Sequence, residues 1–231
     1  MKQQTAIVTG ASGNMGKAVV KKFIEKGYKV IATAVPGDHT AVDYPADQFE
    51  TVQVDLSSET AAAKVVEDVV ANYGAVEVAV LTVGGYAQGD IGSTTSADIS
   101  KQYKLNFETA YHIARPVFSA MMKAGRGRIF LIGSKPGLSA KNGKGMVAYS
   151  LAKSLIFHLA ELMNDEAKGK NIVTSVVVPS TIDTPQNRGA MPSGNFEAWV
   201  KPEQIAEVIY FYASNEADSL REPIIKVYNN S

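Results

Sequence analysis

The sequence predicts one α/β domain in which helices cover both faces of a parallel sheet, and two patterns support this fold class. Short apolar runs alternate with helical segments along the chain, as in folds made of strand–helix–strand units. The predicted strands are continuous apolar runs and not alternating ones, as expected where helices cover both faces of a sheet. Because the sequence contains no linker, repeat or low-complexity tract, we expect residues 1–231 to form a single doubly wound domain.

The expected elements follow from apolar periodicity and from proline and glycine signals. Strands are expected at residues 5–9, 28–34, 51–54, 77–83, 128–133, 172–178 and 223–228. Helices are expected from the glycine loop to Lys26, from Ser57 or Ser58 to about Gly74, over 96–123 and 147–167, and from Pro202 onward. Pro116 is expected to bend or stagger the third of these helices, because proline removes a backbone donor.

Composition excludes several classes of protein. Hydrophobic residues make up 45% and charged residues 20% of the chain, which is typical of an ordinary soluble globular protein. Lys plus Arg equals Asp plus Glu at 23 each, so no basic excess points to nucleic acid or an anionic membrane. The chain has no cysteine, and its three histidines lack metal-ligand spacing, so we expect no metal. The apolar runs are too short for a signal peptide or a membrane span, and a cytoplasmic location is therefore expected.

A glycine-rich loop follows the first predicted strand and opens the first predicted helix. In this context Gly10 permits a tight turn, Gly13 lets the backbone approach a pyrophosphate, and Gly16 lets the helix pack closely on the strand. The helix N-terminus then offers free N–H groups to phosphates. The alternative, a simple strand–helix turn, is disfavoured by the position at the first strand of an alternating chain. The expected cofactor contacts of this loop are Gly10, Ser12, Gly13, Asn14, Met15 and Gly16.

A tyrosine and a lysine stand four residues apart near the start of a long helical segment. Tyr149 and Lys153 would lie on one face of that helix, about 5–6 Å apart at Cβ. An ammonium beside a phenol lowers the phenol pKa from about 10, so the pair could exchange a proton near neutral pH. The alternative is an ordinary helical pair, because this spacing is common.

Together, the glycine loop and the Tyr149–Lys153 pair resemble the short-chain dehydrogenase/reductase family over essentially the whole chain. The resemblance implies a Rossmann fold with a seven-stranded parallel sheet in the order 3-2-1-4-5-6-7. It also implies NAD(P)-dependent hydride transfer between nicotinamide and a carbonyl or alcohol, with Tyr149 as general acid/base. Ser134 resembles the family serine that binds the substrate oxygen, and Asn106 resembles the asparagine that helps hold a proton-relay water. Judged singly, Ser134 would be a strand-end cap and Asn106 a residue that bonds back at a helix bend.

The same resemblance assigns further cofactor contacts and also shows departures. The contacts are Asp55, Leu56, Val83, Gly84, Gly85, Tyr149, Lys153, Pro179, Thr181, Ile182 and Thr184. Residues 83–85 stand where the family usually has Asn-Asn-Ala-Gly, a segment that ties the central strands together, so a local difference is expected there. The interval from Ser134 to Tyr149 is two residues longer than usual, and Ser180 replaces a family glycine.

The cofactor choice depends on the end of the second strand. A 2′-phosphate needs a nearby cation, and no Lys or Arg occurs between Lys29 and Lys64. Asp38 could reach a free ribose diol, or it is simply a turn residue after Pro36-Gly37. The sequence therefore favours NAD(H) over NADP(H), although Ser12, Thr33 and His39 could still bind a phosphate through hydrogen bonds.

Residues 185–200 match the family's flexible substrate lid in position, and their Gly, Pro and Asn content suits a mobile loop. The expected substrate contacts are Tyr86, Met191 and Trp199, with Trp199 in the core as the alternative. The lid and residues 84–87 resemble the dihydropteridine reductase branch, so a quinonoid pterin is the specific alternative substrate. Ser134, which that branch lacks, points back to ordinary carbonyl reduction. A third hypothesis is a non-catalytic dinucleotide-binding sensor.

The expected partners are a small-molecule carbonyl or alcohol and further copies of the chain. Family members usually form homodimers or homotetramers through the asparagine and tyrosine helices. Apolar side chains on the two predicted helices are compatible with such contacts and equally with a buried core. They are Ile113, Phe118, Leu155, Ile156 and Leu159.

Overall fold

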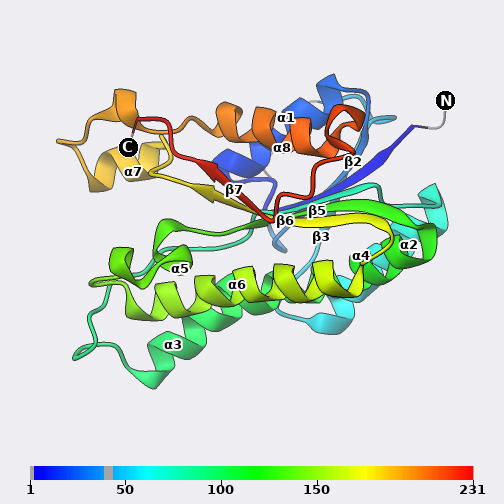
Figure 1. Cartoon of the computed structure of the whole chain (residues 1–231). Helices are drawn as coiled ribbons and strands as arrows, with labels where there is room; N and C mark the ends of the chain where they lie inside the picture. Colours follow the sequence, from blue (N-terminus) through cyan, green and yellow to red (C-terminus); the bar gives the residue numbers. More distant parts are fainter. Residues whose placement is uncertain (1–2, 39–43, 231) are drawn as a thin grey trace.

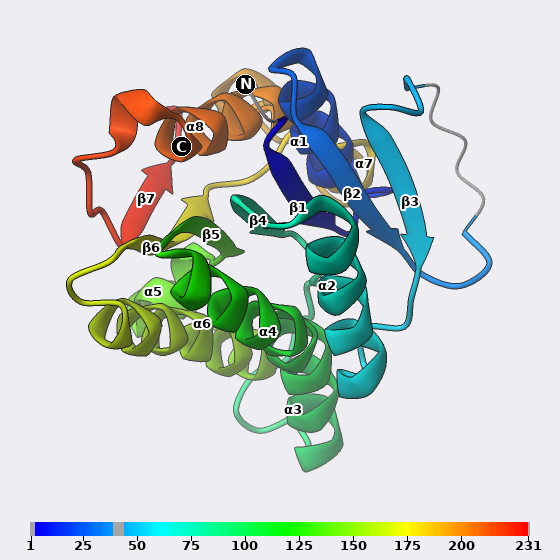
Figure 2. The same ribbon diagram turned by 90° about the vertical axis from the view of Figure 1, so that its right-hand side faces the viewer.

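A parallel sheet of seven strands lies between two layers of helices in the computed structural model, which describes residues 3–38 and 44–230 (Figure 1). The strands are β1 (Thr5–Thr9), β2 (Lys29–Ala34), β3 (Phe49–Gln53), β4 (Val78–Leu81), β5 (Arg126–Ile132), β6 (Asn171–Pro179) and β7 (Ile224–Val227). They follow the order β3-β2-β1-β4-β5-β6-β7, and every neighbouring pair is parallel. Figure 2 shows this order from β3 on the right to β7 on the left. The predicted fold class and strand order are confirmed.

Helices cover both faces of the sheet (Figures 1 and 2). One layer holds α1 (Asn14–Glu25) and α8 (Pro202–Ala213), and the other holds α2 (Glu59–Tyr73), α4 (Thr109–Ala124) and α6 (Val147–Glu166). The side chains of a central strand divide between the two cores. In β1, Ala6 and Val8 belong to the core under α1 and α8, whereas Ile7 belongs to the core on the other face. Since both faces are buried, the strand reads as a continuous apolar run.

The long helix predicted over residues 96–123 consists of three pieces. A regular helix α3 (Ser96–Tyr103) leads into a π-helical turn (Lys104–Glu108) and then into α4. In the π turn the Thr109 N–H donates to the Lys104 carbonyl, one residue further back than in an α-helix. Pro116 lies inside α4, so the change of helix type lies well before the proline that was expected to cause an irregularity.

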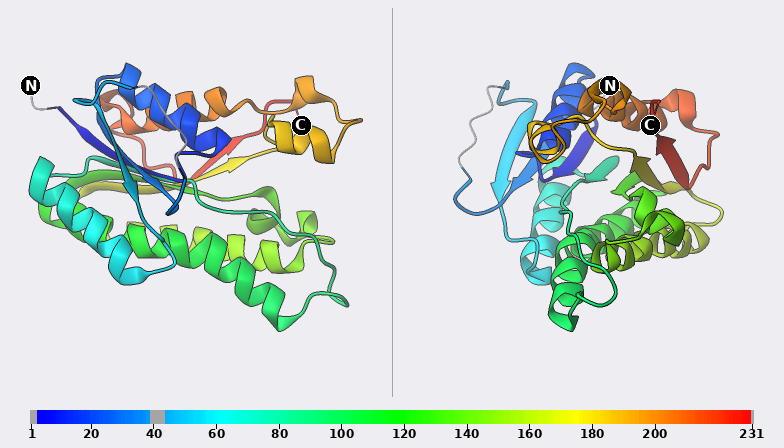
Figure 3. Two further views of the ribbon diagram at one scale, coloured as in Figure 1. Left: turned by 180° about the vertical axis from the view of Figure 1, so that it is seen from behind. Right: turned by 90° about the vertical axis from the view of Figure 1, so that its left-hand side faces the viewer.

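The site lies where the carboxyl ends of the strands meet the loops. β1 and β4 are neighbours at the centre of the sheet, and the chain leaves them toward opposite sides, which makes the crevice between them the expected ligand site. Two short helices that were not predicted, α5 (Lys135–Leu138) and α7 (Pro185–Ala190), lie at this end. Figure 3 shows α7 and α3 there from two further directions. Within the described residues, no helix is long and apolar enough to cross a membrane.

Candidate cofactor and catalytic site

The glycine loop has the close backbone approaches that its sequence predicts. A Cβ atom at position 16 would lie 2.1 Å from the Gly10 carbonyl oxygen, so only glycine fits there. Gly10 itself has φ +63°, a conformation that favours glycine. Gly13 is the N-cap of α1 and provides no side-chain cap, so the first N–H groups of the helix stay available to an anion. The residues present therefore fit a dinucleotide pyrophosphate.

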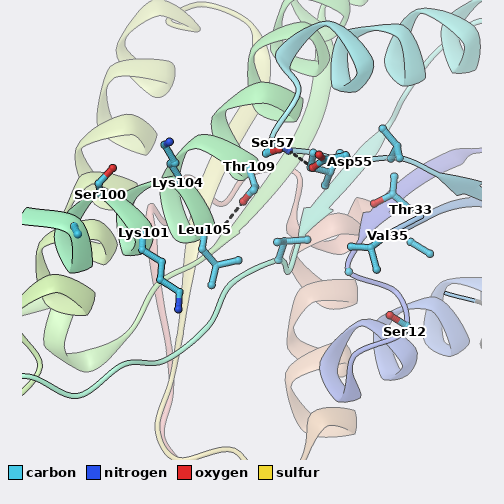
Figure 4. A pocket seen from close by; sticks show the side chains of 16 residues that line it. Ser12, Thr33, Val35, Asp55, Ser57, Ser100, Lys101, Lys104, Leu105 and Thr109 are labelled. Carbon is cyan, nitrogen blue, oxygen red and sulfur yellow. Dashed lines mark hydrogen bonds between the residues drawn. The ribbon is translucent and has the colours of Figure 1, made fainter. Parts of the chain in front are cut away.

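A cavity of about 590 Å³ opens beside this loop (Figure 4). Five of the expected cofactor residues are in its lining: Gly10, Ser12, Asp55, Leu56 and Val83. The Asp55 carboxylate accepts a hydrogen bond from the Ser57 N–H at 2.9 Å, and hydrogen bonds from Ser57 lower its pKa. The cavity thus receives walls from the ends of β1, β2, β3 and β4, as expected at the adenosine end of a dinucleotide site.

Two lysines line this cavity that sequence reasoning missed. Lys101 and Lys104 come from α3 and the π turn, about seventy residues after the strand end where a cation was sought. Figure 4 shows both on one side of the cavity, with Ser12 and Val35 on the other. Their spacing of three residues indicates that both lie on one helix face. That this face borders the cavity follows only from the packing of α3 in the fold.

Residues at the end of β2 form a tight turn. The Asp38 N–H donates to the Val35 carbonyl at 3.0 Å, and Gly37 has φ +86°, which is the geometry of a type II turn with Pro36 before glycine. Gln53 braces the turn, because it bonds the Gly37 N–H and the Asp38 carbonyl, both at 3.2 Å. Thr33 lines the cavity, whereas His39 lies outside the described residues.

The central strands are tied together by threonines in place of the family asparagines. The Thr82 hydroxyl donates to the Thr9 carbonyl at 2.6 Å, and the Thr82 N–H donates to the Thr9 hydroxyl at 3.0 Å. These bonds join the ends of β1 and β4. The local difference expected at residues 83–85 therefore includes Thr82, whose role sequence reasoning missed.

Asn106 lies in the π turn and is buried. Its side chain forms a two-point contact with the backbone of Gly85, since Oδ1 accepts from the Gly85 N–H and Nδ2 donates to the Gly85 carbonyl, both at 3.0 Å. Nδ2 also lies 2.9 Å from Gln102 Oε1 and 3.3 Å from the Gln102 carbonyl. The side-chain amide is therefore used by the protein itself, and it fixes the segment after β4 against the helix.

Ser134 both caps a helix and contacts the tyrosine. It is the N-cap of α5, where its hydroxyl oxygen accepts from the Gly137 N–H at 3.1 Å. The same hydroxyl forms a hydrogen bond with Tyr149. Because the cap occupies the oxygen as an acceptor, the hydroxyl hydrogen is free to point at the phenol. Ser134 is therefore a cap at the end of β5 that also neighbours Tyr149, and its role in binding the substrate oxygen stays a prediction.

Tyr149 and Lys153 share one face of α6, but their electrostatics differ from the expectation. Burial raises the pKa of the Tyr149 phenol, and this effect exceeds the lowering by the hydrogen bond with Ser134. Lys153 is 4% exposed, and its Nζ donates to the Ile132 carbonyl at 2.8 Å. Burial lowers the pKa of Lys153 to about 8. The expected lowering of the phenol pKa by the Lys153 ammonium is therefore wrong: the pKa of Tyr149 is raised, with burial as the largest cause.

The four residues expected to be catalytic lie together. Ser134 contacts Tyr149, and Lys153 binds the carbonyl two residues before Ser134. A Cβ atom placed on Gly84 would lie 2.7 Å from Asn106 Oδ1 and 3.2 Å from Lys153 Nζ, so these two polar groups meet at one point. The quartet combines a hydroxyl donor, a phenol, a buried amine and an amide that orders the loop.

The segment after β6 runs back toward the glycine loop. Thr181 and Ile182 pair with Val200, since the Val200 N–H donates to the Thr181 carbonyl at 2.9 Å and residues 182 and 200 form a β-bridge. Ser180, which replaces the family glycine, donates its hydroxyl to the Tyr228 carbonyl at 2.8 Å. Thr184 caps α7 by accepting from the Asn187 N–H. The extra hydroxyl thus fastens β6 to the chain after β7.

The expected lid contains the short helix α7 and a 3₁₀ turn (Phe196–Ala198). Arg188 forms two hydrogen bonds to the Asp183 carboxylate, at 2.6 and 2.8 Å, and lies over the Phe196 ring. Gln186 accepts from Asn14 of the glycine loop at 2.8 Å. The lid helix therefore contacts the phosphate-binding loop directly.

The three expected substrate residues have different surroundings. Tyr86 is 59% exposed and meets the Tyr149 ring edge to face, with centroids 5.4 Å apart. Met191 is exposed at the end of α7. Trp199 is buried and packs on Phe196 and Gly194, as in the alternative that placed it in the core.

Comparisons with known proteins agree with this geometry. The family model of the short chain dehydrogenases matches residues 4–193. The chain is 29% identical to the acetoacetyl-CoA reductase of Acinetobacter sp. (strain RA3849) over 190 residues, which cover 79% of this chain and 76% of that protein. It is 26% identical to the 3-oxoacyl-acyl-carrier-protein reductase FabG of Escherichia coli (strain K12) over 225 residues, 92% of this chain and 90% of that one.

Solved structures have the same fold. A protein described as a short-chain dehydrogenase/reductase from Burkholderia xenovorans has a TM-score of 0.86 at 25% identity, covering 99% of this chain and 96% of that one. The ligand-free aldohexose dehydrogenase of Thermoplasma acidophilum has a TM-score of 0.82 at 22% identity, covering 98% and 92%. The fold and site thus define a dinucleotide-binding α/β oxidoreductase, and the chain belongs to the short-chain dehydrogenase/reductase family. It is an NAD(P)-dependent enzyme acting on a carbonyl or alcohol.

Proposed function

We propose that the protein reduces a small carbonyl compound with NAD(P)H, with Tyr149 as the proton donor. The observation that carries the proposal is the arrangement of Ser134, Tyr149 and Lys153 at the carboxyl ends of the central strands. The raised pKa of Tyr149 keeps the phenol protonated at neutral pH, and the protonated phenol is the form a general acid needs.

Each residue has a distinct part in this proposal. Ser134 donates its hydroxyl hydrogen to the substrate oxygen, and Tyr149 delivers the proton as charge develops there. Lys153 stabilises the phenolate that remains, while Asn106 orders the backbone at which a relay water returns the proton. The bound nicotinamide supplies the hydride. Gly10, Ser12, Gly13, Asn14, Met15 and Gly16 hold its phosphates in this assignment.

The remaining expected cofactor contacts fit the same site. Asp55, Leu56, Val83, Gly84 and Gly85 would border the adenosine half and the ribose. Pro179, Thr181, Ile182 and Thr184 would meet the nicotinamide half. We keep NAD(H) as the predicted cofactor because the sequence has no Lys or Arg between Lys29 and Lys64. The candidates to hold a 2′-phosphate are Lys101 and Lys104 in the cavity wall and Lys17, which lines a small pocket with Ala34 and Asp38. Titration of the protein with NADH and NADPH shows which cofactor binds more tightly. If Lys101 holds the 2′-phosphate, Lys101→Ala should weaken the binding of NADPH and leave that of NADH unchanged.

A quinonoid dihydropterin is a second candidate substrate. It is favoured by Tyr86, whose exposed ring stands beside the Tyr149 phenol and offers a face for a flat heterocycle. Met191 and the lid would close over such a ring. The relatives named as acetoacetyl-CoA and 3-oxoacyl reductases favour an aliphatic carbonyl instead.

We further propose that two copies of the chain associate through α6 and α4. Leu151, Leu155 and Leu162 stay 50%, 39% and 52% exposed on α6, at the spacing of one helix face. Tyr111 of α4 is also exposed. Ile113 and Ile156, which the sequence offered for this contact, are buried in the core of the chain, and Phe118 and Leu159 are partly buried against it.

The test is a screen of 3-oxoacyl thioesters, simple ketones, aldoses and quinonoid pterins with both reduced cofactors. For any substrate found, Tyr149→Phe is expected to lower kcat/KM by about 10²- to 10⁴-fold, the usual worth of a general acid. Tyr212→Phe, on α8, is the matched control and should leave kcat/KM unchanged. Undiminished reduction by Tyr149→Phe would refute the mechanism, and cofactor binding without reduction of any substrate would favour the sensor hypothesis.

A further inference from the structure

Two glycines from separate elements enclose the Lys153 side chain. Gly84 follows β4 and Gly137 lies in α5, whereas Lys153 lies in α6. A Cβ atom at position 84 would lie 3.2 Å from Lys153 Nζ, and one at position 137 would lie 2.6 Å from Lys153 Cβ. One glycine therefore borders the amine at the tip of the side chain, and the other borders its base.

The lack of room for a side chain, and not an unusual backbone conformation, explains why positions 84 and 137 are glycine. Neither Gly84 nor Gly137 is among the glycines with a positive φ, so an L-residue could adopt either backbone. The obstacle is contact. At position 137 a methyl group would meet the Lys153 carbonyl carbon and oxygen at 2.8 and 2.9 Å, and backbone atoms of a packed helix cannot move aside cheaply.

Position 84 is the more informative of the two. Its Cβ would also lie 2.7 Å from Asn106 Oδ1, the atom that accepts from the Gly85 N–H. Gly84 thus borders the two side chains to which the proposed mechanism gives the stabilisation of the phenolate and the ordering of the backbone at the relay water. A methyl group there has one flexible neighbour that can give way, which is the Lys153 amine, because Asn106 is held by four hydrogen bonds.

We propose that Gly84 and Gly137 are positioning residues that form a socket for Lys153, and that the missing side chain at position 84 sets where the ammonium stands relative to Asn106 and Tyr149. The floor of the socket is the Ile132 carbonyl, which accepts from Lys153 Nζ at 2.8 Å. Lys153 forms no salt bridge with the described residues. Its location therefore depends on shape and one backbone acceptor, not on a carboxylate. The inference rests on the proposed function only in giving Lys153 a part in catalysis.

The test is the Gly84→Ala variant, with Gly92→Ala as the matched control. The control methyl would meet only Asp90 Oδ1, at an ordinary 3.6 Å. Lysines labelled with ¹³C at Cε are titrated by NMR, and Lys153→Met identifies the signal. The pKa of Lys153 is about 8 in the wild type, and the same value is expected in Gly92→Ala. In Gly84→Ala the amine is displaced from its buried position at the Ile132 carbonyl, so it is less desolvated and its pKa is expected to rise by about one unit or more.

A Lys153 pKa that is identical in all three proteins would overturn the socket. This titration needs neither substrate nor cofactor, so its result stands even if no carbonyl compound is reduced. With a substrate in hand, Gly84→Ala should lower kcat about tenfold and shift the alkaline limb of the pH profile in the same direction. If Gly84→Ala fails to fold, the Gly84→Ala/Asn106→Ala double variant is titrated instead, because it removes the closer contact at 2.7 Å and keeps the one with the Lys153 amine at 3.2 Å. A Lys153 pKa that is the same in this double variant and in Asn106→Ala would contradict the proposal.

Discussion

At the residue scale, the chemistry depends on a buried amine that has one backbone partner. Lys153 has lost nearly all contact with water, and its Nζ bonds the Ile132 carbonyl. Such an environment disfavours the charged form, which is why its pKa is about 8. Reduction should therefore weaken as the pH rises above about 8, because the ammonium that supports the Tyr149 phenolate is then lost.

Burial of Lys153 also predicts how stability depends on pH. Below pH 8 both the folded and the unfolded chain hold the lysine proton, so the folded state carries the full cost of a buried charge. Between the folded pKa of about 8 and the ordinary 10.5, the folded state releases the proton first and becomes more stable as the pH rises. The gain is on the order of 3 kcal/mol at about 1.4 kcal/mol per pKa unit.

The measurement is urea unfolding of the wild type and of Lys153→Met at pH 7 and pH 10. The difference in the free energy of unfolding isolates Lys153, because all other groups titrate in both proteins. From pH 7 to pH 10 we expect the free energy of unfolding of the wild type to rise relative to that of Lys153→Met. A difference that stays constant with pH would show that Lys153 titrates normally in the folded state.

At the scale of elements, a π turn and a short helix position two of the site residues. The π turn puts Asn106 opposite Gly85, and the short helix α5 turns Ser134 toward Tyr149. The loop after β4 then reaches the start of α6, where the Val147 N–H donates to the Gly89 carbonyl at 2.9 Å. A straight helix over residues 96–123 would change the register of Asn106 relative to this loop.

The lid helix α7 offers the prediction at this scale. Arg188→Gln removes the two hydrogen bonds to Asp183 and the contact with the Phe196 ring. Although exposed ion pairs are worth only about 0–1 kcal/mol, this one spans a six-residue helix with few other contacts. Amide hydrogen exchange of residues 185–190 is expected to rise about threefold to tenfold. Arg115→Gln, which breaks the surface pair with Glu59, is the control, and an equal rise in both variants would contradict a lid held by Arg188.

At the scale of the whole molecule, the order of the strands brings distant residues to one crevice. The glycine loop, Asn106 and the pair Ser134–Tyr149 come from three different crossovers, and they meet because all seven strands are parallel and end on the same side. Most of this was predictable from the sequence. Apolar runs and glycine spacing are local signals, and the tyrosine–lysine pair needs only helical geometry.

What was not predictable depends on contacts between segments far apart in the chain. The Thr9–Thr82 bonds, the π turn and the lysines of the cavity wall require the packed fold. The direction of the Tyr149 pKa shift requires knowledge of burial, which spacing does not provide. Ile113 and Ile156 read as surface candidates only because a helix pattern does not say which apolar face meets a partner.

The proposed dimer gives the prediction at this scale. Leu155→Asp places a charge in the apolar face of α6, and burying an unpaired charge costs about 3–5 kcal/mol, which weakens association at least about a hundredfold. Leu220→Asp is a matched control, because Leu155 and Leu220 are both 39% exposed and Leu220 lies outside the helices. Analytical ultracentrifugation is expected to find the Leu155→Asp protein monomeric and the control associated. Association that survives in Leu155→Asp would place the contact elsewhere.

The central claim is hydride transfer to a carbonyl carbon coupled to proton donation by Tyr149. The most direct measurement follows deuterium from the C4 position of the reduced nicotinamide into the product by mass spectrometry, in the wild type and in Tyr149→Phe, with a carbonyl substrate from the screen. The predicted result is one deuterium on the product carbon for the wild type, and formation of that product slowed by about 10²-fold or more in the variant. Unlabelled product, or labelled product formed equally fast by both proteins, would contradict the account.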